Sequence, residues 1–445
     1  MRRPILEGLG AGRLTTASIV TFSHFYVAIA TLVQSMVLAR LLSLAEFGQL
    51  AAALAIAGLA EAAINARASE TALAVFARST AHNRAETESL TRQLLVLDLA
   101  WSAGAYLILL IATLIYDFVF GADPRLFYGL MLAGFISFPW GTAKGYITVH
   151  LSARKFAPVE LSYVTTAFVI GLGLSYFLGS LGFVLGVLAA SLVRTLVGLH
   201  MIGLNLKSAW FGARSLGQFD RKAIWSFGFT GTLRSFLING LQQIDLLILA
   251  VLASPSSVGL YRAAKNLSSI PQRLGQPIWV LLKRHVIAGA DQRRHRSSRD
   301  PVILASALLL ALGVLAAPGL LLADQAMAFL FGPEYAPAGI LLWWLLPAAW
   351  IMYGVGGWTS TFGSVSERRF WILSIYLVQL LTILVVLFIE GVDPTAMAMA
   401  VALAQVAASG AFWWLYLVRR RRRGRAGGLI DSLDDEDKGR SVELF

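Results

Sequence analysis

The chain has 445 residues, of which 57% are hydrophobic and 14% are charged, and its formal net charge at pH 7 is +12. Soluble proteins carry about 45–50% apolar and about 25% charged residues, so this composition excludes an ordinary soluble domain and predicts a protein that crosses a membrane many times. The positive charge does not indicate a nucleic-acid partner, because the basic residues lie mainly between the apolar runs, and the absence of cysteine excludes disulfides, thiolate metal sites and cysteine nucleophiles.

Apolar runs long enough to span a bilayer, which takes about 20 residues, recur along the whole chain. The first run follows Arg2, Arg3 and Arg13 with no evident small-residue cleavage site, so we expect it to be retained as a membrane helix. The twelve predicted spans cover residues 17–39, 46–66, 93–116, 126–148, 159–178, 181–203, 224–251, 257–282, 302–322, 337–358, 370–389 and 394–418. The expected fold is an all-α polytopic membrane protein with twelve transmembrane helices.

The basic residues gather in every second connection between these spans. Large groups lie within residues 283–299 and 419–425, whereas the alternate connections hold only Arg40 and Arg125 beside several acidic residues. Cytoplasmic loops of membrane proteins retain Lys and Arg, so this pattern predicts that both termini are cytoplasmic.

An internal repeat divides the chain near its middle. The stretch VLARLLSLAEFGQLAAAL around Phe47-Gly48 aligns with ILAVLASPSSVGLYRAAK around Val258-Gly259, 211 residues later. Six helices return the chain to its starting side, so we expect two parallel lobes related by a pseudo-two-fold axis along the membrane normal. The predicted units are an N-lobe at 1–203, a cytoplasmic linker at 204–223, a C-lobe at 224–418, and a basic then acidic disordered cytoplasmic tail at 419–445.

The seventh and eighth spans carry charged residues deep inside apolar sequence. These residues are Arg234, Asp245, Arg262, Lys265 and Arg273. Each such charge costs about 2.5–3.5 kcal/mol at the membrane centre, so it is expected to face a bundle interior or a water-filled cavity. The last three are spaced at i, i+3 and i+11, which predicts that they share one stripe of a helix.

We interpret the four cations Arg234, Arg262, Lys265 and Arg273 as the lining of a substrate-binding cavity. Asp245 can neutralise only one of them, and it is also a candidate for ion coupling or gating. The alternative is a set of purely structural ion pairs. Pro271 and Pro277 lie on either side of Arg273, so a break in this helix is expected, either as part of an anion site or as a packing kink.

The second span ends in a polar cluster that includes Glu61, Arg67 and Glu70. In one interpretation these residues line the same cavity as coupling or gating groups, and in the other they form a locally neutral packed set. Lys144 and Arg194 lie in the first lobe within about two turns of the cytoplasmic surface, and we expect both side chains to snorkel toward it. The alternative is that they line the cavity.

Motifs for catalysis and metal binding are missing from the sequence. No two of the six histidines stand at metal-ligand spacing, and the phosphate-binding pattern G-x-x-x-x-G-K-[ST] is absent. We therefore expect no metal site, no cofactor, no catalytic residue and no ATP hydrolysis in this chain. An ion gradient is the candidate energy source.

Three stretches carry a family resemblance. They are VLARLLSLAEFGQLAAALAIAGLAEAAI from Val37, YRAAKNLSSIP from Tyr261 and FGPEYAPAGILLWWLLPA from Phe331. Together with twelve spans in two lobes, they resemble the polysaccharide transporters, the O-antigen and exopolysaccharide flippases of the multidrug/oligosaccharidyl-lipid/polysaccharide (MOP) superfamily. The chain departs from that family late in the second helix, where members carry an acidic–glycine step and this sequence has Asn65 to Arg67.

The resemblance implies a flippase of a bacterial inner membrane, not an enzyme. Its substrate would be a saccharide linked to a polyprenyl pyrophosphate, moved from the cytoplasmic to the outer leaflet by alternating access for surface polysaccharide biosynthesis. Its partners would be that lipid-linked saccharide, membrane lipids and other polysaccharide-assembly proteins. A cationic cavity suits such a substrate independently, because arginine binds phosphate oxygens with two parallel hydrogen bonds.

Two other classes of function remain open. A multidrug or organic-ion exporter of the same fold would show acidic cavities, whereas basic residues are in excess inside these spans. A membrane-embedded polysaccharide polymerase or ligase would need a large outer loop with catalytic arginine or histidine, and the predicted outer loops are short.

Overall fold

The computed structural model describes residues 11–78, 84–120, 124–150, 155–203, 240, 243–273, 301–353 and 369–430. Within these ranges the regular structure is helical, and no β-strand occurs. The first half of the chain forms α1 (Ala11–Leu41), α2 (Leu44–Arg78), α3 (Arg84–Phe120), α4 (Arg125–Ile136), α5 (Phe138–His150) and α6 (Phe156–Met201). The second half forms the helix Gln243–Leu252, α9 (Pro255–Ser268), α11 (Pro301–Ala316), η3 (Ala317–Leu322), α12 (Ala323–Phe331), η4 (Pro333–Ala338), α13 (Gly339–Ile351), α15 (Arg369–Glu390) and α16 (Pro394–Ile430).

Seven segments of the described chain are long and apolar enough to cross a membrane. Their outer faces expose large hydrophobic side chains, among them Phe177 with 78% and Phe388 with 91% of the side chain accessible. Extended apolar surface of this kind is rare on soluble monomers and is expected where lipid covers the protein. The prediction of an all-helical multi-pass membrane protein is therefore confirmed.

Two breaks inside the helices lie where sequence and backbone chemistry require them. α6 extends over 46 residues, but Gly179 interrupts it with φ 59° and ψ −138°, between the predicted spans 159–178 and 181–203. The predicted span 126–148 consists of α4 and α5, which meet at Ser137. Pro139 has no N–H to continue α4 and stands in the first turn of α5, where proline is tolerated. The count of twelve spans stays a prediction, because residues 204–239, 274–300 and 354–368 lie outside the described ranges.

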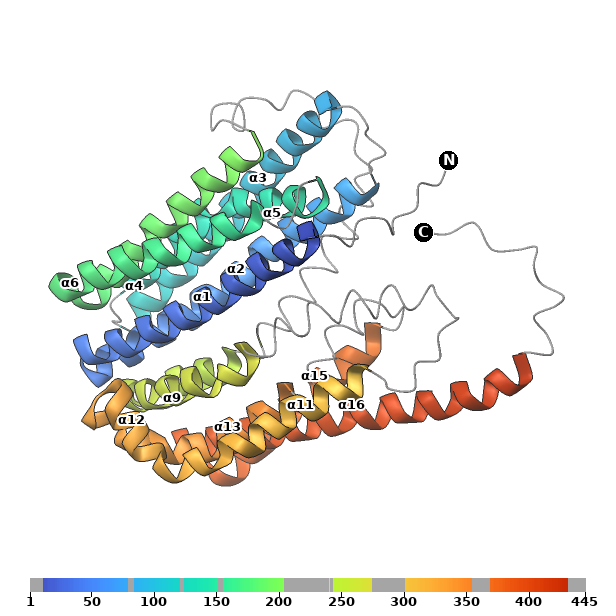
Figure 1. Cartoon of the computed structure of the whole chain (residues 1–445). Coiled ribbons are helices and arrows are strands. Elements are labelled where there is room, and N and C mark those ends of the chain that lie inside the picture. Colours follow the sequence, from blue (N-terminus) through green and yellow to red (C-terminus); the bar gives the residue numbers. More distant parts are fainter. Residues whose placement is uncertain are drawn as a thin grey trace.

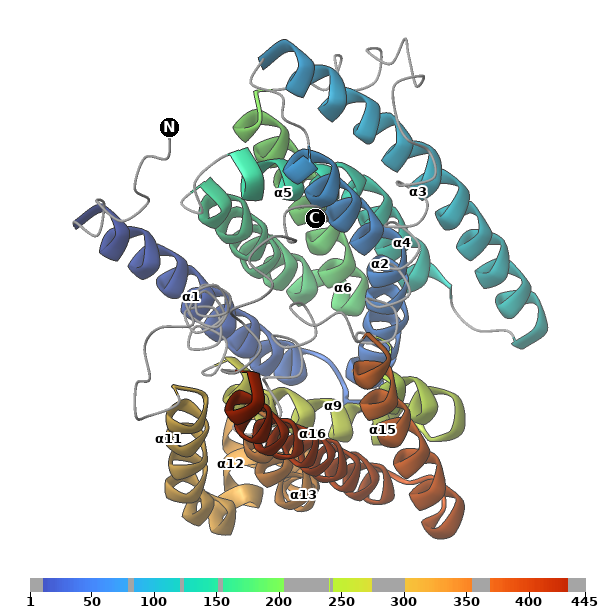
Figure 2. The ribbon, with the colours of Figure 1, turned by 90° about the vertical axis from the view of Figure 1, so that its right-hand side faces the viewer.

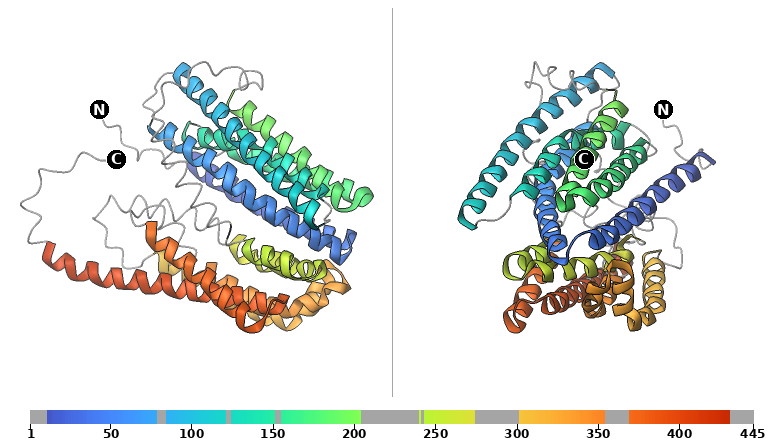
Figure 3. Two further views of the ribbon diagram at one scale, coloured as in Figure 1. Left: turned by 180° about the vertical axis from the view of Figure 1, so that it is seen from behind. Right: turned by 90° about the vertical axis from the view of Figure 1, so that its left-hand side faces the viewer.

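The helices form two groups, which Figure 1 shows on either side of the boundary between α2 and α9. Helices α1 to α6 form the N-terminal group, and α9 to α16 form the C-terminal group. The ribbons approach each other at the end where α9 begins and diverge toward the opposite end (Figures 1 and 3). Figure 2, viewed along the molecule, shows α1 and α2 as the N-terminal helices that lie against α9.

The approaching ends of α2 and α9 are built by the same local chemistry. Before α2, Ser43 and Glu46 form a capping box, in which the Ser43 N–H donates to Glu46 Oε2 at 3.0 Å and the Glu46 N–H donates to Ser43 Oγ at 3.3 Å. Before α9, Ser254 Oγ accepts the N–H of Ser257 at 3.2 Å. These caps satisfy backbone donors that a helix start leaves unpaired, so both helices begin at fixed positions.

Beyond the caps, the two helices cross at a pair of glycines. A Cβ atom at Gly48 would lie 1.8 Å from the carbonyl oxygen of Pro255, and one at Gly259 would lie 2.5 Å from the carbonyl oxygen of Leu44. The contact is reciprocal, since each glycine meets the first residue of the opposite helix and equivalent residues are 211 positions apart. Reciprocal contacts of this form are expected at an interface with two-fold symmetry.

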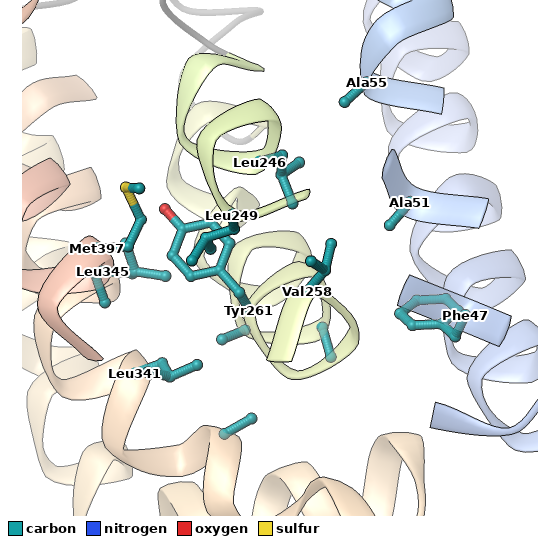
Figure 4. Packing of buried hydrophobic residues seen from close by; sticks show 14 of the residues in the cluster. Phe47, Ala51, Ala55, Leu246, Leu249, Val258, Tyr261, Leu341, Leu345 and Met397 are labelled. Carbon is teal, nitrogen blue, oxygen red and sulfur yellow. The ribbon is translucent and has the colours of Figure 1, made fainter. Parts of the chain in front are cut away.

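The largest hydrophobic core joins both groups around α9 (Figure 4). Leu246 and Val258 lie on the side that faces Phe47 and Ala51 of α2, while Tyr261 points away toward the C-terminal group. At the same end, Arg40 of α1 donates from Nε to the carbonyl oxygen of Leu330 at 3.3 Å, and from Nη2 to that of Phe329. This end of the molecule is therefore closed by backbone contact, apolar packing and hydrogen bonds between the groups.

Candidate transport site

α9 supplies two of the charged residues that the sequence analysis singled out, Arg262 and Lys265. They flank Ala263 and Ala264, which are buried. The helix ends at Ser268, and helical residues resume at 270. The break precedes Pro271, which has no N–H to continue the helix, and the sequence predicted a break beside this proline.

Asp245 and Lys265 form a buried ion pair inside the C-terminal group. Lys265 Nζ lies 2.7 Å from Asp245 Oδ1 and 2.8 Å from Oδ2. Tyr261 donates its hydroxyl to Oδ2 at 2.6 Å, and the N–H of Leu246 donates to Oδ1 at 2.8 Å. Asp245 is only 2% exposed, so its charge needs these partners to remain inside the protein.

Arg273 and Asn266 connect α9 and its continuation to α1 of the N-terminal group. The Nη1 atom of Arg273 donates to the carbonyl oxygen of Ala28 and to Thr31 Oγ1. Asn266 Nδ2 donates to Ser35 Oγ at 2.5 Å. The polar face of α9 therefore contributes to the boundary between the two groups.

Arg262 and Arg273 differ from Lys265 in that neither forms an ion pair with a described carboxylate. Within the described part of the chain, Asp245 pairs with Lys265, and no carboxylate forms an ion pair with either arginine. Both arginines line the same polar cavity, which has a volume of about 220 Å³. Its other walls come from α13, α15, α16 and the helix Gln243–Leu252. Two guanidinium groups that form no ion pair with a described carboxylate make this wall suitable for an anion.

The predicted site residues fall into three sets. Arg262, Lys265, Arg273 and Asp245 line one cavity, and their roles stay predictions. Arg234 lies outside the described residues, and Arg67 and Glu70 lie on α2 with side chains that are not described.

Glu61, the third residue predicted on α2, lies beside Arg194 of α6, with 3.8 Å between Oε1 and Nη1. The side chain of Arg194 is 14% exposed and packs between aromatic rings. The expectation that Arg194 snorkels to the surface is therefore wrong. No group of three potential metal ligands occurs among the residues that the structure describes.

Sequence reasoning missed the polar residues that complete the cavity. Tyr261 binds Asp245, and Gln243 and Gln405 each bring a buried side-chain oxygen that has no hydrogen-bond partner. Gln243 stands two residues before Asp245 at the start of an apolar run, and a polar residue at such a place could have been recognised as a candidate for the cavity wall. Gln405 comes from the distant α16, and no local pattern connects it with α9.

The arrangement of membrane-crossing helices in two groups, with a charged cavity beside their boundary, is similar to that of solved transporters of the MOP superfamily. The lipid II flippase MurJ in an inward closed conformation matches 90% of this chain over 87% of its own, with a TM-score of 0.66 and 12% identity. An inward-facing multidrug resistance MATE family transporter of the MOP superfamily matches 91% of this chain over 99% of its own, with a TM-score of 0.64 and 12% identity. A MOP superfamily transporter from Pyrococcus furiosus, described by the reverse polarity of its binding pocket, matches 90% of this chain over 94% of its own, with a TM-score of 0.56 and 15% identity.

The chain belongs to the polysaccharide biosynthesis protein family, whose sequence model matches residues 14–281. No curated protein sequence matches the chain significantly. The expected resemblance to polysaccharide transporters of the MOP superfamily is confirmed by the family and the fold together. The chain is accordingly a polysaccharide biosynthesis protein with the fold of the MOP superfamily transporters.

Proposed function

We propose that the protein flips a saccharide linked to polyprenyl pyrophosphate from the cytoplasmic to the outer leaflet, for surface polysaccharide biosynthesis. The observation that carries this proposal is the pair of arginines on the wall of the cavity, Arg262 and Arg273, for which the described residues provide no carboxylate partner. A pyrophosphate or an acidic sugar supplies the missing negative charge. The lipid chain of the substrate stays in the bilayer while the charged head passes through the protein.

Energetics favour an anionic substrate over a cationic one. Each arginine in the membrane interior costs about 2.5–3.5 kcal/mol without a partner, so a bound oxyanion offsets an existing penalty. Asp245 is the acidic residue that lines the cavity, and Lys265 and Tyr261 already occupy both of its oxygens. A multidrug exporter of organic cations would need that carboxylate free.

The path of the substrate lies between two lobes of six helices. The N-lobe covers residues 1–203 and the C-lobe residues 224–418, joined by a linker at 204–223 and followed by the tail. The reciprocal contact between Gly48 and Gly259 supports a parallel pseudo-two-fold repeat with an offset of 211 residues. In this arrangement the closed end faces outward, the termini are cytoplasmic, and the lobes alternate between two open forms.

The ion pair between Asp245 and Lys265 is a candidate for coupling transport to an ion gradient, together with Glu61, Arg67 and Glu70. Opening the pair would expose two charges to the cavity, and closing it would neutralise both. Arg234 is proposed as a further cation of the same wall, on the basis of its place in the apolar run.

The experiment is to measure polysaccharide export and membrane abundance together in cells that carry single substitutions. We expect Arg262→Gln and Arg273→Gln to reduce export at least about tenfold at unchanged abundance, because a charge-assisted hydrogen bond contributes about 1.5–3 kcal/mol. Lys155→Gln is the matched control, since it removes the same charge from an exposed side chain. Export at the wild-type level from the arginine variants would reject the anion site. Export that falls only in step with abundance would assign the arginines a structural role.

A further inference from the structure

Arg194 is held in a fixed orientation inside the N-terminal group. Its guanidinium carbon lies 4.8 Å from the ring centre of Tyr163 and 5.2 Å from that of Trp140. Gly198, one turn later on α6, makes room for the indole, because a Cβ there would come within 3.2 Å of Trp140 Cε3. The two rings attract the cation and fix the plane in which its N–H groups point.

The described residues around this arginine do not accept hydrogen bonds from its N–H groups. Nε of Arg194 is buried and has no hydrogen-bond partner. Nη1 lies 3.8 Å from Glu61 Oε1, which is too long for a hydrogen bond. Among the described residues no hydrogen bond involves this guanidinium, although arginine carries five N–H donors. Unused buried donors normally carry a penalty, so a ligand that accepts from them gains free energy.

The predicted repeat places neutral residues at the equivalent positions of the C-terminal group. The residues that lie 211 positions after Glu61 and Arg194 are Gln272 and Gln405, and both line the cavity of the C-terminal group as neutral amides. The buried ion pair of that group is instead Asp245–Lys265. At the predicted offset, Arg194 therefore carries a charge where the C-terminal group has the neutral amide of Gln405.

The side of Arg194 that faces Glu61 is the accessible one. Glu61 has a side chain that is 42% exposed, and it belongs to α2, the helix that also reaches the C-terminal group. Glu61 therefore belongs to a helix that forms part of the boundary along which the proposed substrate moves.

We propose that Arg194 is a second oxyanion-binding residue, held by Trp140 and Tyr163 on the N-terminal group, with Glu61 as a resident anion that the ligand displaces. The ligand is a phosphate of the lipid carrier or a carboxylate of an acidic sugar, because both accept two parallel hydrogen bonds from a guanidinium. This inference rests on the proposed function for the nature of the substrate. It adds a contact on the opposite side of the boundary from Arg262 and Arg273.

The test measures binding to the purified full-length protein in nanodiscs of phosphatidylcholine, which lacks anionic lipid. The probes are inorganic pyrophosphate and glucuronate, which separate the phosphate source from the sugar-carboxylate source. We expect Arg194→Gln to weaken one probe about tenfold and Arg194→Lys to weaken it less, because lysine keeps the charge and loses the planar fork. Lys155→Gln, which removes an exposed charge, should bind both probes like the wild type.

Glu61→Gln separates an oxyanion site from a structural ion pair. Removing a competing carboxylate should tighten binding roughly threefold. If Glu61 and Arg194 form a purely structural ion pair, Glu61→Gln should lower the melting temperature and should not tighten binding, because it leaves the buried cation of Arg194 without its partner.

Equal affinities of the wild type and Arg194→Gln for both probes, or no binding of either probe to the wild type, would overturn the inference. The first result leaves the proposed function untouched, because the export measurement with Arg262 and Arg273 tests it separately, whereas the second result counts against both.

Discussion

Asp245→Asn should destabilise the protein because it leaves the ammonium group of Lys265 without its counter-ion. The carboxylate accepts two contacts from Lys265 at 2.7 and 2.8 Å and is itself 2% exposed. Breaking a buried pair by removing one partner costs about 3–5 kcal/mol. The side chain of Lys265 is 25% exposed to the cavity, which reduces the cost, and we expect about 2–3 kcal/mol.

The assay is thermal unfolding in detergent micelles for a double-mutant cycle. Asp245→Asn should lower the midpoint by about 4 °C in a chain of this size. Adding Lys265→Met should restore more than half of the loss, because a hydrophobic replacement of both partners removes the unpaired charge. If the double variant is as unstable as the sum of the two single variants, the pair contributes no coupling and the reasoning fails.

Two further predictions concern the closed end. Gly48→Ala should lower thermal stability by about 1–3 kcal/mol and reduce export, because its Cβ would meet the Pro255 carbonyl oxygen at 1.8 Å, whereas Gly58→Ala, with nothing within 4 Å, should change neither. Arg40→Gln removes the hydrogen bonds to the end of α12, so a cysteine introduced as Val258→Cys, at a position only 1% exposed, should react faster with a membrane-impermeant maleimide. The chain has no cysteine of its own to interfere, and an unchanged labelling rate would show that Arg40 does not hold this end closed.

The sequence predicted much of the helical architecture because transmembrane helices are apolar over their whole length. Gly179 and Pro139 stand at the breaks in α6 and between α4 and α5, since glycine permits a positive φ and proline cannot continue a helix. These signals are local, so they can be read from the chain itself.

Which cation pairs with Asp245 and which one reaches α1 could be determined only from the tertiary structure. The spacing i, i+3 and i+11 placed three cations on one stripe, but successive residues turn by about 100°. Lys265 is therefore about 60° away from Arg262 on α9, and Arg273 lies beyond the break that follows Ser268. That difference turns Lys265 toward Asp245 in the C-terminal group, while Arg273 reaches α1.

The cluster around Arg194 could not be read from sequence at all. Its rings come from α5 and from the other arm of α6, and its carboxylate neighbour comes from α2. Distance from the membrane surface suggested snorkelling, but Gly198 and Trp140 create a more favourable position inside the bundle.

The most direct test of the central claim is a flipping assay with purified protein in liposomes. The substrate is a fluorescent oligosaccharide linked to polyprenyl pyrophosphate, and a fluorescent organic cation serves as the competing cargo. The account predicts that the wild type moves the lipid-linked saccharide between leaflets and does not move the cation. It also predicts that the combined Arg262→Gln and Arg273→Gln variant moves neither, although it reconstitutes as efficiently as the wild type. Equal rates for the wild type and this variant, or transport of the cation alone, would contradict a cationic site for an anionic lipid-linked substrate.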